Sequence, residues 1–461
     1  MFATSQHVHF IGIGGIGMSG IAEILLNLGM KVSGSDLRRT PVTDRLARLG
    51  ATVYEGHDAG HVDGATVVVT SSAVGAGNPE VAEARARKIP VIQRAEMLAE
   101  LMRLKYGIAI AGMHGKTTTT SMVASVLAAG GLDPTVVVGG RVNALGSNAR
   151  LGTTQYLVAE ADESDRSFLK LSPILAVVTN LDREHMDCYH DMADVEDAFL
   201  AFMDRVPFYG AVIACADNPL LAAVLPRARR RVLTYGASAQ ADYRLESLQT
   251  QPGCHARFLV ASKAGPLGPF DLNVPGRHNI LNAASAVAVA HQLDVPAHRI
   301  AEGLRQFHGV DRRFQQLGTV RGVAVVDDYG HHPTEIRATL SAARECGYRR
   351  IHVVFQPHRY SRTSDLLAEF GSAFADADSV VVLPIYAAGE EPIPGVTANL
   401  LVDRIEGPKV SYSADFGAAA ESVTAEAREG DLILTLGAGS VSHLAPQILE
   451  SLQRASSAAG R

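Results

Sequence analysis

Short runs of apolar residues alternate along the chain with longer stretches in which apolar positions recur every three to four residues. The short runs predict buried strands, and the longer periodic stretches predict helices. In the first hundred residues we expect strands at 8–11, 31–35, 52–54, 67–70 and 91–92, and helices at 16–28, 43–49, 79–87 and 95–103. Alternation of this kind is typical of a mostly parallel sheet with helices on its faces.

The alternation continues through the rest of the chain. The middle region has predicted strands at 136–139, 156–159, 176–179 and 212–214, a less regular piece at 243–271 and a helix at 279–291. The last third has predicted strands at 322–327, 351–355, 380–383 and 432–436, with helices at 336–346, 363–375 and 418–428. We therefore expect an α/β protein with three domains, at residues 1–104, 105–313 and 314–461.

The composition narrows the classes of protein to which the chain can belong. Its 461 residues are 47% hydrophobic and carry a net charge of −6. Without a basic field, nucleic acid is not an expected partner, and no run of about 18 apolar residues predicts membrane insertion. The cysteines lie far apart with no CxxC pair, which argues against a disulfide framework or a zinc site and favours a reducing, cytoplasmic location. They are Cys188, Cys215, Cys254 and Cys346.

The run AGMHGKTTTT, which begins at Ala111, is the strongest chemical signal in the sequence. An apolar strand precedes it and a helix pattern follows it, as in loops that cradle nucleotide phosphates. In such a loop backbone N–H groups and Lys116 face the phosphates, while the hydroxyl of Thr117 reaches Mg²⁺. Ile110 stands where the longer GxxxxGK[ST] motif has its first glycine, so the prediction of ATP binding rests on the shorter Gly112-x-x-Gly115-Lys116-Thr117 pattern.

A second glycine loop follows the first predicted strand. Gly12, Gly14 and Gly17 form a GxGxxG pattern that opens a helix, and Asp36 ends the next strand. This context is that of a dinucleotide fingerprint, in which glycines let a pyrophosphate approach a helix N-terminus. NAD, FAD and nucleotide sugars all present a pyrophosphate, so the loop does not identify its ligand. A strand-to-helix turn without any ligand is the plainer alternative.

Two acidic clusters follow strands of the middle region. EADESD begins at Glu160, directly after the strand 156–159, and NLDREHMD follows the strand 176–179 and contains His185. Open α/β sheets place ligands at the carboxyl ends of their strands, and carboxylates and imidazoles are metal ligands. The clusters therefore favour a Mg²⁺ site beside the phosphate loop, with solvated acidic loops as the alternative.

Nine strings in this order resemble the Mur ligases, the ATP-dependent amide ligases of peptidoglycan synthesis. The strings are HFIGIGGIGMSGIAE, SSAVGAGNPE, GMHGKTTTT, VAEADESD, TNLDREHMD, GRHNILNAASA, DRRFQ, VDDYGHHPTE and QPHRYSRT. The resemblance implies a Rossmann-like N-terminal domain for a UDP-sugar, a central P-loop ATPase-like domain with a parallel sheet for ATP and Mg²⁺, and a Rossmann-like C-terminal domain for an amino acid. The first string and the doublet His331-His332 resemble members that join L-alanine to the lactyl carboxylate of UDP-N-acetylmuramate.

The resemblance also implies roles for individual residues. ATP would be bound by Gly112, Met113, His114, Gly115, Lys116, Thr117, Thr118, His278, Asn279, Asn282 and Arg313. The UDP-sugar would be bound by Gly12, Gly14, Gly15, Gly17, Asp36, Ser71 and Arg94, and the amino acid by Asp328, Tyr329, His331, Arg359 and Arg362. Thr117 and Glu160 would hold one Mg²⁺ and His185 a second. Lys116, Glu160, His185 and His331 would be catalytic.

The implied reaction activates a carboxylate with ATP and transfers the resulting acyl group to an amine. No lysine occurs between His185 and Tyr209, so the carbamoylated lysine of several sister ligases has no counterpart here. Because water would hydrolyse an acyl phosphate, closure of the C-terminal domain is expected. An NAD-dependent oxidoreductase, a non-catalytic nucleotide switch and a sister ligase that attaches a preformed peptide remain as alternatives. The oligomeric state, monomer or homodimer, stays open.

Overall fold

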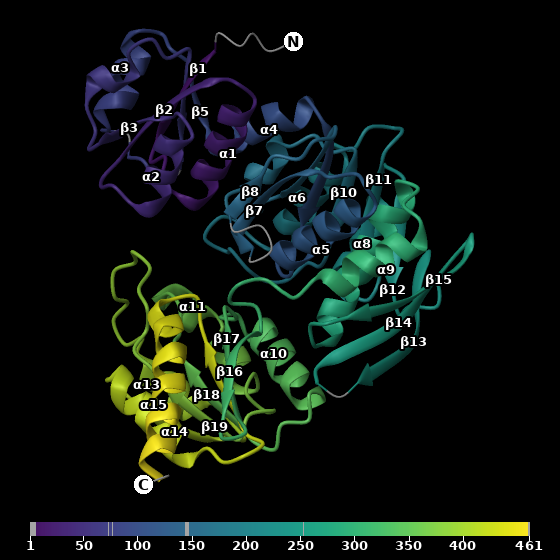
Figure 1. Ribbon diagram of the computed structural model, residues 1–461, viewed down its shortest axis with the longest axis vertical. Helices are drawn as coiled ribbons and strands as arrows, with labels where there is room; N and C mark the ends of the chain where they lie inside the picture. Colours follow the sequence, from purple (N-terminus) through teal and green to yellow (C-terminus); the bar gives the residue numbers. More distant parts are fainter. Residues whose placement is uncertain (1–5, 72, 76, 143–146, 252, 460–461) are drawn as a thin grey trace. The chain divides into compact units, whose positions relative to one another are not determined.

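The computed structural model describes residues 6–71, 73–75, 77–142, 147–251 and 253–459, and its strands form three separate sheets. Figure 1 shows helices packed around each sheet. Contacts divide the chain into two compact units. The first comprises Met1–Ser247, Leu259–Phe270 and Leu281–Phe307, and the second comprises Leu248–Phe258, Asp271–Ile280 and His308–Arg461. Among the described residues, no helix combines the length and apolar character needed to cross a membrane.

The N-terminal sheet has five parallel strands in the order β3-β2-β1-β4-β5. This order places the first glycine loop at the carboxyl end of the central strand, as in dinucleotide-binding folds. Helix α3 covers a core cluster that includes Ile11, Val68 and Val81. The elements are β1 (His7–Ile11), α1 (Ile16–Asn27), β2 (Lys31–Asp36), α2 (Pro41–Arg48), β3 (Thr52–Glu55), η1 (Ala59–Val62), β4 (Val67–Thr70), α3 (Pro79–Ala86), β5 (Val91–Gln93) and α4 (Arg94–Arg103). All predicted strands and helices of this region are present. In the string SSAVGAGNPE, Ser72 and Ala76 lie outside the described residues.

The central sheet has ten strands in the order β15-β14-β13-β12-β11-β10-β6-β9-β7-β8. Its middle part is parallel, with β6 between β9 and β10. The elements of this part are β6 (Tyr106–Ala111), α5 (Lys116–Ala129), β7 (Thr135–Val142), β8 (Ser147–Arg150), β9 (Tyr156–Glu160), η3 (Ser167–Lys170), β10 (Leu175–Val178), α6 (Met192–Met203), β11 (Ala211–Cys215), α7 (Pro219–Val224), η4 (Leu225–Arg227) and β12 (Val232–Gly236). Because β6 has a strand on each side, the loops after three neighbouring strands meet at one edge.

The piece at 243–271, expected to be less regular, consists of three long strands. They are β13 (Tyr243–Gln251), β14 (His255–Ser262) and β15 (Gly265–Leu272), and they are consecutive neighbours in the sheet joined by short turns. Helices α8 (Arg277–Gln292) and α9 (Ala297–Gln306) follow them. The burial of β14 alternates between exposed and buried residues over His255–Phe258, so one face of this strand is covered.

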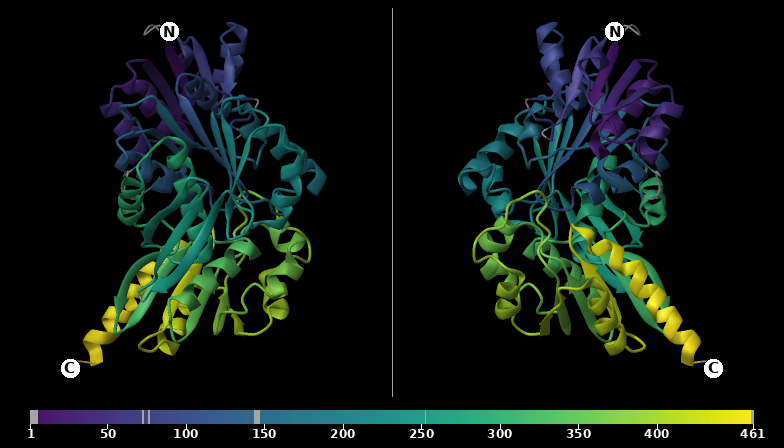
Figure 2. Two further views of the ribbon diagram at one scale, coloured as in Figure 1. Left: turned by 90° about the vertical axis from the view of Figure 1, so that its right-hand side faces the viewer. Right: turned by 90° about the vertical axis from the view of Figure 1, so that its left-hand side faces the viewer.

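The C-terminal sheet has six strands in the order β16-β17-β21-β18-β19-β20, parallel except for the pair β16 and β17. Its elements are β16 (Gln315–Val320), β17 (Val323–Asp328), α10 (Pro333–Glu345), β18 (Ile351–Phe355), α11 (Tyr360–Asp365), α12 (Leu367–Gly371), β19 (Ser379–Val382), α13 (Ala398–Arg404), β20 (Lys409–Tyr412), α14 (Phe416–Glu426), β21 (Leu432–Leu436), η5 (Ser440–His443) and α15 (Leu444–Ala459). Figure 2 shows α15 as the long helix at the C-terminal end, packed against α14 and β16. The predicted helix 363–375 is wrong as a single element, because the chain forms α11 and α12 there.

Two of the four cysteines are paired, contrary to the expectation from the sequence. Cys254, in the turn after β13, and Cys346, at the end of α10, form a disulfide across 92 residues of sequence, and both belong to the second unit. Cys188 and Cys215 are free. The two cysteines are distant in sequence, and the fold brings them together.

Candidate functional site

The phosphate loop lies at the carboxyl end of β6, between two acidic loops. Ile110 of β6 is paired with Glu160 of β9, and Ala111 is paired with Val178 of β10. The loops that begin after these three strands therefore start at one edge of the sheet. Helix α5 begins at Lys116 and presents its N-terminus at the same edge, where backbone N–H groups and the helix dipole favour an anion.

Both glycines of the phosphate loop are required by its geometry. Gly112 has φ of +133°, and a Cβ atom there would collide with the hydroxyl of Thr179. Gly115 has φ of +82° and precedes α5 as its N-cap, and a Cβ atom there would lie 3.0 Å from the side-chain oxygen of Asn282. Asn282 therefore lies beside the phosphate loop, within the first unit.

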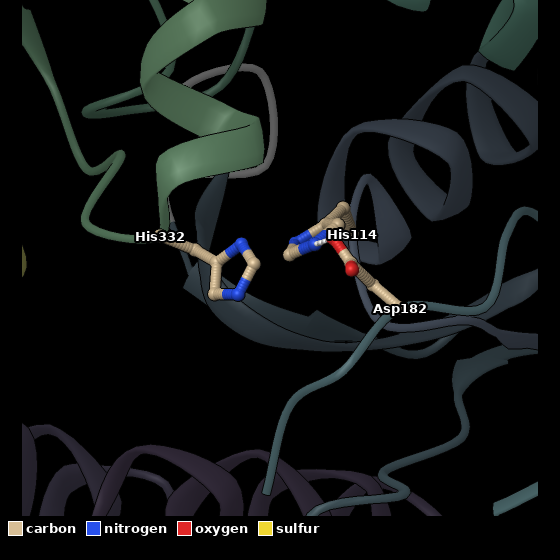
Figure 3. Close-up of side chains that lie close together, drawn as sticks. All are labelled: His114, Asp182 and His332. Carbon is tan, nitrogen blue, oxygen red and sulfur yellow. Dashed lines mark hydrogen bonds and ion pairs between the residues drawn. The ribbon is translucent and has the colours of Figure 1, made fainter. Parts of the chain in front are cut away.

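The loop after β10 holds the phosphate loop through the backbone of His114. The His114 N–H donates to Asn180 Oδ1 (2.9 Å), while Asn180 Nδ2 and Thr179 Oγ1 donate to the His114 carbonyl (2.9 and 2.7 Å). The His114 ring donates from Nε2 to the carboxylate of Asp182 (2.8 Å), and Figure 3 shows this bond. Backbone and side chain of one residue are thus fixed by the loop that also carries His185.

Lys116 is held by a buried carboxylate. Its Nζ donates to Glu163 Oε1 (2.7 Å) and to the carbonyls of Gly112 and Met113 (2.9 and 3.2 Å). Burial lowers the pKa of Lys116, but the charge of Glu163 and its hydrogen bond outweigh burial, so the net pKa is raised. The lysine is therefore a permanent cation at the loop, as a phosphate-binding residue must be.

The residues proposed as Mg²⁺ ligands come from the three converging loops. Thr117 follows Lys116 in the first turn of α5, Glu160 is the last residue of β9, and His185 lies after β10 with a left-handed φ of 58°. A hydroxyl, a carboxylate and an imidazole are donors that suit a divalent cation. The second oxygen of Glu163, Oε2, is buried and has no hydrogen-bond partner among the described residues. It can therefore accept a hydrogen bond from a ligand or from water bound to a metal ion. The donor set fits Mg²⁺.

Arg94 connects the first glycine loop with the acidic loop after β9. Its guanidinium forms an ion pair with Asp162 (3.6 Å), and a Cβ atom on Gly17 would collide with it. Burial raises the pKa of Asp162, but the charge of Lys116 and the hydrogen bonds from Ser164 outweigh burial and lower it, so Asp162 is ionised. The guanidinium of Arg94 thus lies against Gly17 and pairs with the acidic loop at the same time.

In the N-terminal glycine loop, the carboxylate of Asp36 accepts the N–H of Gly14 (2.8 Å). Gly12, with φ of +77°, and Ile13 donate their N–H groups to the Ser35 carbonyl. Gly15 is the N-cap of α1. Because glycine has no side chain to cap the helix, the N-terminal backbone N–H groups of α1 can face a ligand. Ser71 follows β4 at the same edge of the sheet. Asp36 thus uses one oxygen within the loop, where a dinucleotide fingerprint would use it for a ribose hydroxyl.

The C-terminal residues gather at the carboxyl end of β17 within the second unit. Asp328 accepts the N–H groups of Phe314 (2.6 Å) and Gly330 (2.7 Å), and burial raises its pKa to about 6, against the opposing effect of Arg313. The guanidinium of Arg313 lies 5.0 Å from the ring centre of Tyr329 and forms an ion pair with Glu335 (3.3 Å). Asp328 thereby fixes the loop that carries Tyr329.

His331 lies beside His358, which also contacts one of the two predicted arginines. The Nδ1–H of His331 donates to the Tyr329 carbonyl (3.0 Å), so in the neutral ring Nε2 carries the lone pair. The rings of His331 and His358 are 5.3 Å apart, and Arg362 donates to His358 Nδ1 (3.1 Å). Burial, followed by the charges of His331 and Arg362, lowers the pKa of His358 to about 3, so this ring is a neutral acceptor. Arg359 has φ of 70° at the start of α11.

The remaining predicted ATP contacts lie at the start of α8. Burial, followed by the charge of Arg313, lowers the pKa of His278 to about 4, so its imidazole is neutral at pH 7. Asn279 donates from its side chain to the Pro275 carbonyl (2.7 Å), which fixes the start of the helix. His278 therefore shares its surroundings with Arg313 within the second unit.

Sequence reasoning did not single out Glu163, Asn180 or Asp182, although each lies in a quoted string. Asn218 was also missed, and its side chain donates to and accepts from the backbone of Leu181 (3.2 and 3.3 Å). Their positions in the loops that follow buried strands were the available signal, because open α/β sheets bind ligands at this edge. Their partners, 37 to 68 residues away, could not be identified from spacing.

Three family models cover most of the chain. They are described as the Mur ligase family catalytic domain, matched at residues 7–106, the Mur ligase middle domain, matched at 110–290, and the Mur ligase glutamate ligase domain, matched at 312–439. The chain belongs to the Mur ligase family. This assignment confirms the predicted three-domain α/β architecture and the family resemblance read from the nine strings.

Individual Mur ligases match almost the whole chain. A UDP-N-acetylmuramate–L-alanine ligase from Acidobacterium capsulatum is 70% identical over 453 residues, which cover 98% of this chain and 99% of the relative. The ligase of the same name from Koribacter versatilis is 64% identical and covers 98% of both chains. The crystal structure of UDP-N-acetylmuramate-alanine ligase from Thermotoga maritima matches with a TM-score of 0.79 and 29% identity, over 97% of this chain and 99% of that one.

Proposed function

We propose that this Mur ligase joins L-alanine to the lactyl carboxylate of UDP-N-acetylmuramate with ATP, which gives ADP and phosphate. The observation that carries the proposal is the convergence of three loops at one sheet edge, after β6, β9 and β10. They combine a phosphate loop and its half-buried Lys116 with two acidic loops. The relatives of matching length named as UDP-N-acetylmuramate–L-alanine ligases support the choice of substrates.

In the first step the lactyl carboxylate attacks the γ-phosphorus of ATP to give an acyl phosphate and ADP. Two anions must approach each other, so charge has to be neutralised. Lys116 and the N-terminus of α5 supply positive charge from the protein. Bound Mg²⁺, held by Thr117 and Glu160 at one position and by His185 at another, would supply further positive charge to the phosphate oxygens.

In the second step the amine of alanine attacks the acyl carbon, and phosphate leaves. The amine must be neutral to attack, and His331 Nε2 has the lone pair to accept its proton or to position it. Arg359 and Arg362, three residues apart at the start of α11, are suited to grip the carboxylate of the amino acid. Asp328 keeps the loop of Tyr329 and His331 in place.

The UDP-sugar belongs to the N-terminal domain in this proposal. The open N-terminus of α1 suits its pyrophosphate, with Gly12, Gly14 and Gly15 allowing close approach. Arg94, which contacts the glycine loop and Asp162, would bring the sugar end toward the ATP site. We also propose a cytoplasmic location, where ATP and UDP-sugars are available.

The test is a phosphate-release assay with ATP, Mg²⁺ and UDP-N-acetylmuramate against a panel of amino acids. We expect release that depends on L-alanine and on the UDP-sugar. A preformed peptide in place of alanine tests the sister-ligase alternative, and fluorescence titration with NADH tests the oxidoreductase alternative. Absence of alanine-dependent phosphate release would overturn the proposal.

A further inference from the structure

One carboxylate in the ATP site contacts two residues that are proposed to act on the reaction. Oε1 of Glu163 accepts a hydrogen bond from Lys116 Nζ (2.7 Å) and lies 3.5 Å from His185 Nε2. The side chain of Glu163 is fully buried, with 0% of its surface exposed, while Lys116 and His185 remain 18% and 20% exposed. Glu163 therefore stands behind both residues, on the side away from solvent.

The second oxygen of this carboxylate is the unusual feature. Oε2 is buried and has no hydrogen-bond partner among the described residues. A buried charged oxygen without a partner costs free energy, so natural structures keep such groups where function needs them. The backbone around it is firmly held, because the Glu163 carbonyl accepts the hydroxyl of Tyr189 (2.7 Å) and the N–H of Arg166 (3.1 Å). The carboxylate is thus held through its backbone and through Oε1, and Oε2 is not needed to keep it in place.

A carboxylate beside a histidine selects which ring nitrogen carries the proton. Nε2 of His185 lies 3.5 Å from Oε1 of Glu163, and a proton that this carboxylate holds on Nε2 would leave Nδ1 with the lone pair that a metal ion needs. The chain has no lysine between His185 and Tyr209 that could do this as a carbamoylated side chain. Of the two glutamates whose carboxylates approach His185 Nε2, Glu163 is the nearer and the more buried. Its Oε1 is 3.5 Å away, whereas Oε1 of Glu184 is 4.0 Å away.

We propose that Glu163 is a positioning residue of the activation site, which orients His185 toward Mg²⁺ and restrains Lys116 until Mg²⁺–ATP binds. This inference rests on the proposed function for its substrates. Oε2 would accept a hydrogen bond from a donor that arrives with Mg²⁺–ATP, such as water held by the metal. Because Lys116 is also held by Glu163, a nucleotide without Mg²⁺ has to compete with this carboxylate for the lysine.

The test measures binding of a fluorescent ATP analogue, with and without Mg²⁺, by the full chain carrying Glu163→Gln. We expect the half-saturating Mg²⁺ concentration to rise about 10-fold or more, the usual effect of losing such a partner. In EDTA the variant should bind the analogue at least as tightly as the unaltered protein, because Lys116 has lost its competing anion. The matched control is Asp165→Asn, an exposed acid of the same loop, which should stay within about twofold.

Equal weakening of nucleotide binding in EDTA and in Mg²⁺ would overturn the proposal, because it would indicate damage to the loop alone. An unchanged Mg²⁺ requirement would also overturn it. If circular dichroism shows that Glu163→Gln does not fold, Glu163→Asp takes its place. Aspartate keeps the charge, but its shorter side chain moves the carboxylate away from Lys116 and His185. We expect a rise of about threefold or more in its half-saturating Mg²⁺ concentration, and no rise would refute the role. Because binding is measured without turnover, failure of alanine-dependent phosphate release would count against the proposed function alone.

Discussion

Glu80 of the N-terminal domain provides a quantitative test of how the fold stabilises a buried charge. Its carboxylate is completely buried near the N-terminus of α3 and has no lysine or arginine among its described partners. It accepts hydrogen bonds from Ser35 Oγ (2.7 Å), His57 Nδ1 (3.0 Å) and His61 Nδ1 (2.8 Å), with His9 Nε2 at 3.6 Å. We expect Glu80→Gln to destabilise this domain, because glutamine keeps the shape but not the charge.

The magnitude follows from the shift in pKa. Burial raises the pKa of Glu80, but the interactions with His9, Ser35 and His61 outweigh burial and lower it from 4.5 to about 2. A shift of about 2.5 units corresponds to about 3 kcal/mol of free energy of unfolding at pH 7. Since the pKa is lowered in the folded state, this contribution is complete above pH 4.5 and disappears as the pH falls toward 2. The same relation leaves about 2 kcal/mol at pH 3.5.

The assay is hydrogen exchange of the N-terminal peptides, read by mass spectrometry at pH 7 and at pH 3.5. Local exchange is preferable to a global melt because a chain of several domains does not unfold in one step. Glu83→Gln on the same helix is the control, because its ion pair with Arg87 is partly exposed and contributes about 1 kcal/mol or less. The reasoning fails if Glu80→Gln and Glu83→Gln behave alike at pH 7. A deficit of equal size at both pH values would also refute it.

Four further predictions concern the rest of the chain. Lys116→Ala should abolish ADP formation, which an ADP assay measures, while UDP-sugar binding is largely retained; full ADP release would contradict its role. Gly112→Ala should weaken nucleotide binding by about 10-fold or more, because the new Cβ collides with Thr179 and φ is +133°. Asp328, with a pKa raised to about 6, should make the second unit less stable as the pH rises from about 4 to 6, by about 2 kcal/mol in denaturant titrations. Asp328→Asn should remove this pH dependence. Cys346→Ser should lower the free energy of unfolding by about 2–4 kcal/mol, because it removes the disulfide. If the unaltered protein is equally stable with and without reductant in denaturant titrations, this prediction is contradicted.

The sequence predicted best those parallel strands that are continuous apolar runs buried on both faces. β10, for example, is Leu175–Val178 with every residue buried, and it begins within one residue of the predicted strand. The sequence missed β12 and β20, whose residues are largely half-buried or exposed. β15 shows why other strands were less evident. Its sequence, GPLGPFDL, contains two glycines and two prolines, and the strand lies at the end of the central sheet, where an edge position tolerates them. Tertiary pairing with β14 outweighed the local preference of this segment.

The candidate site was predictable where chemistry is carried by residue type and local spacing, as in the Gly112 to Thr117 loop. The identity of Glu163 as the partner of Lys116 was not, because 47 residues separate them and three other acids stand in the same short cluster. Glu163 lies in the loop beyond β9, and the fold of this loop brings its side chain to Lys116. The break between α11 and α12 is similar, since Leu366 leaves helical geometry with φ of −113° and ψ of 19°. The roles assigned to individual site residues stay predictions.

The disulfide between Cys254 and Cys346 closes a covalent ring that contains β14, β15, α8, α9, β16, β17 and α10, and the junction at 308–314 that connects α9 with β16. A protease that cuts the backbone once inside this ring leaves two fragments that remain joined through sulfur. Such a cut at the junction would release nothing on a non-reducing gel, and the fragments would separate only after a thiol is added. Limited proteolysis of this protein therefore has to be read as a pair of gels, and the difference between them maps cuts inside the ring.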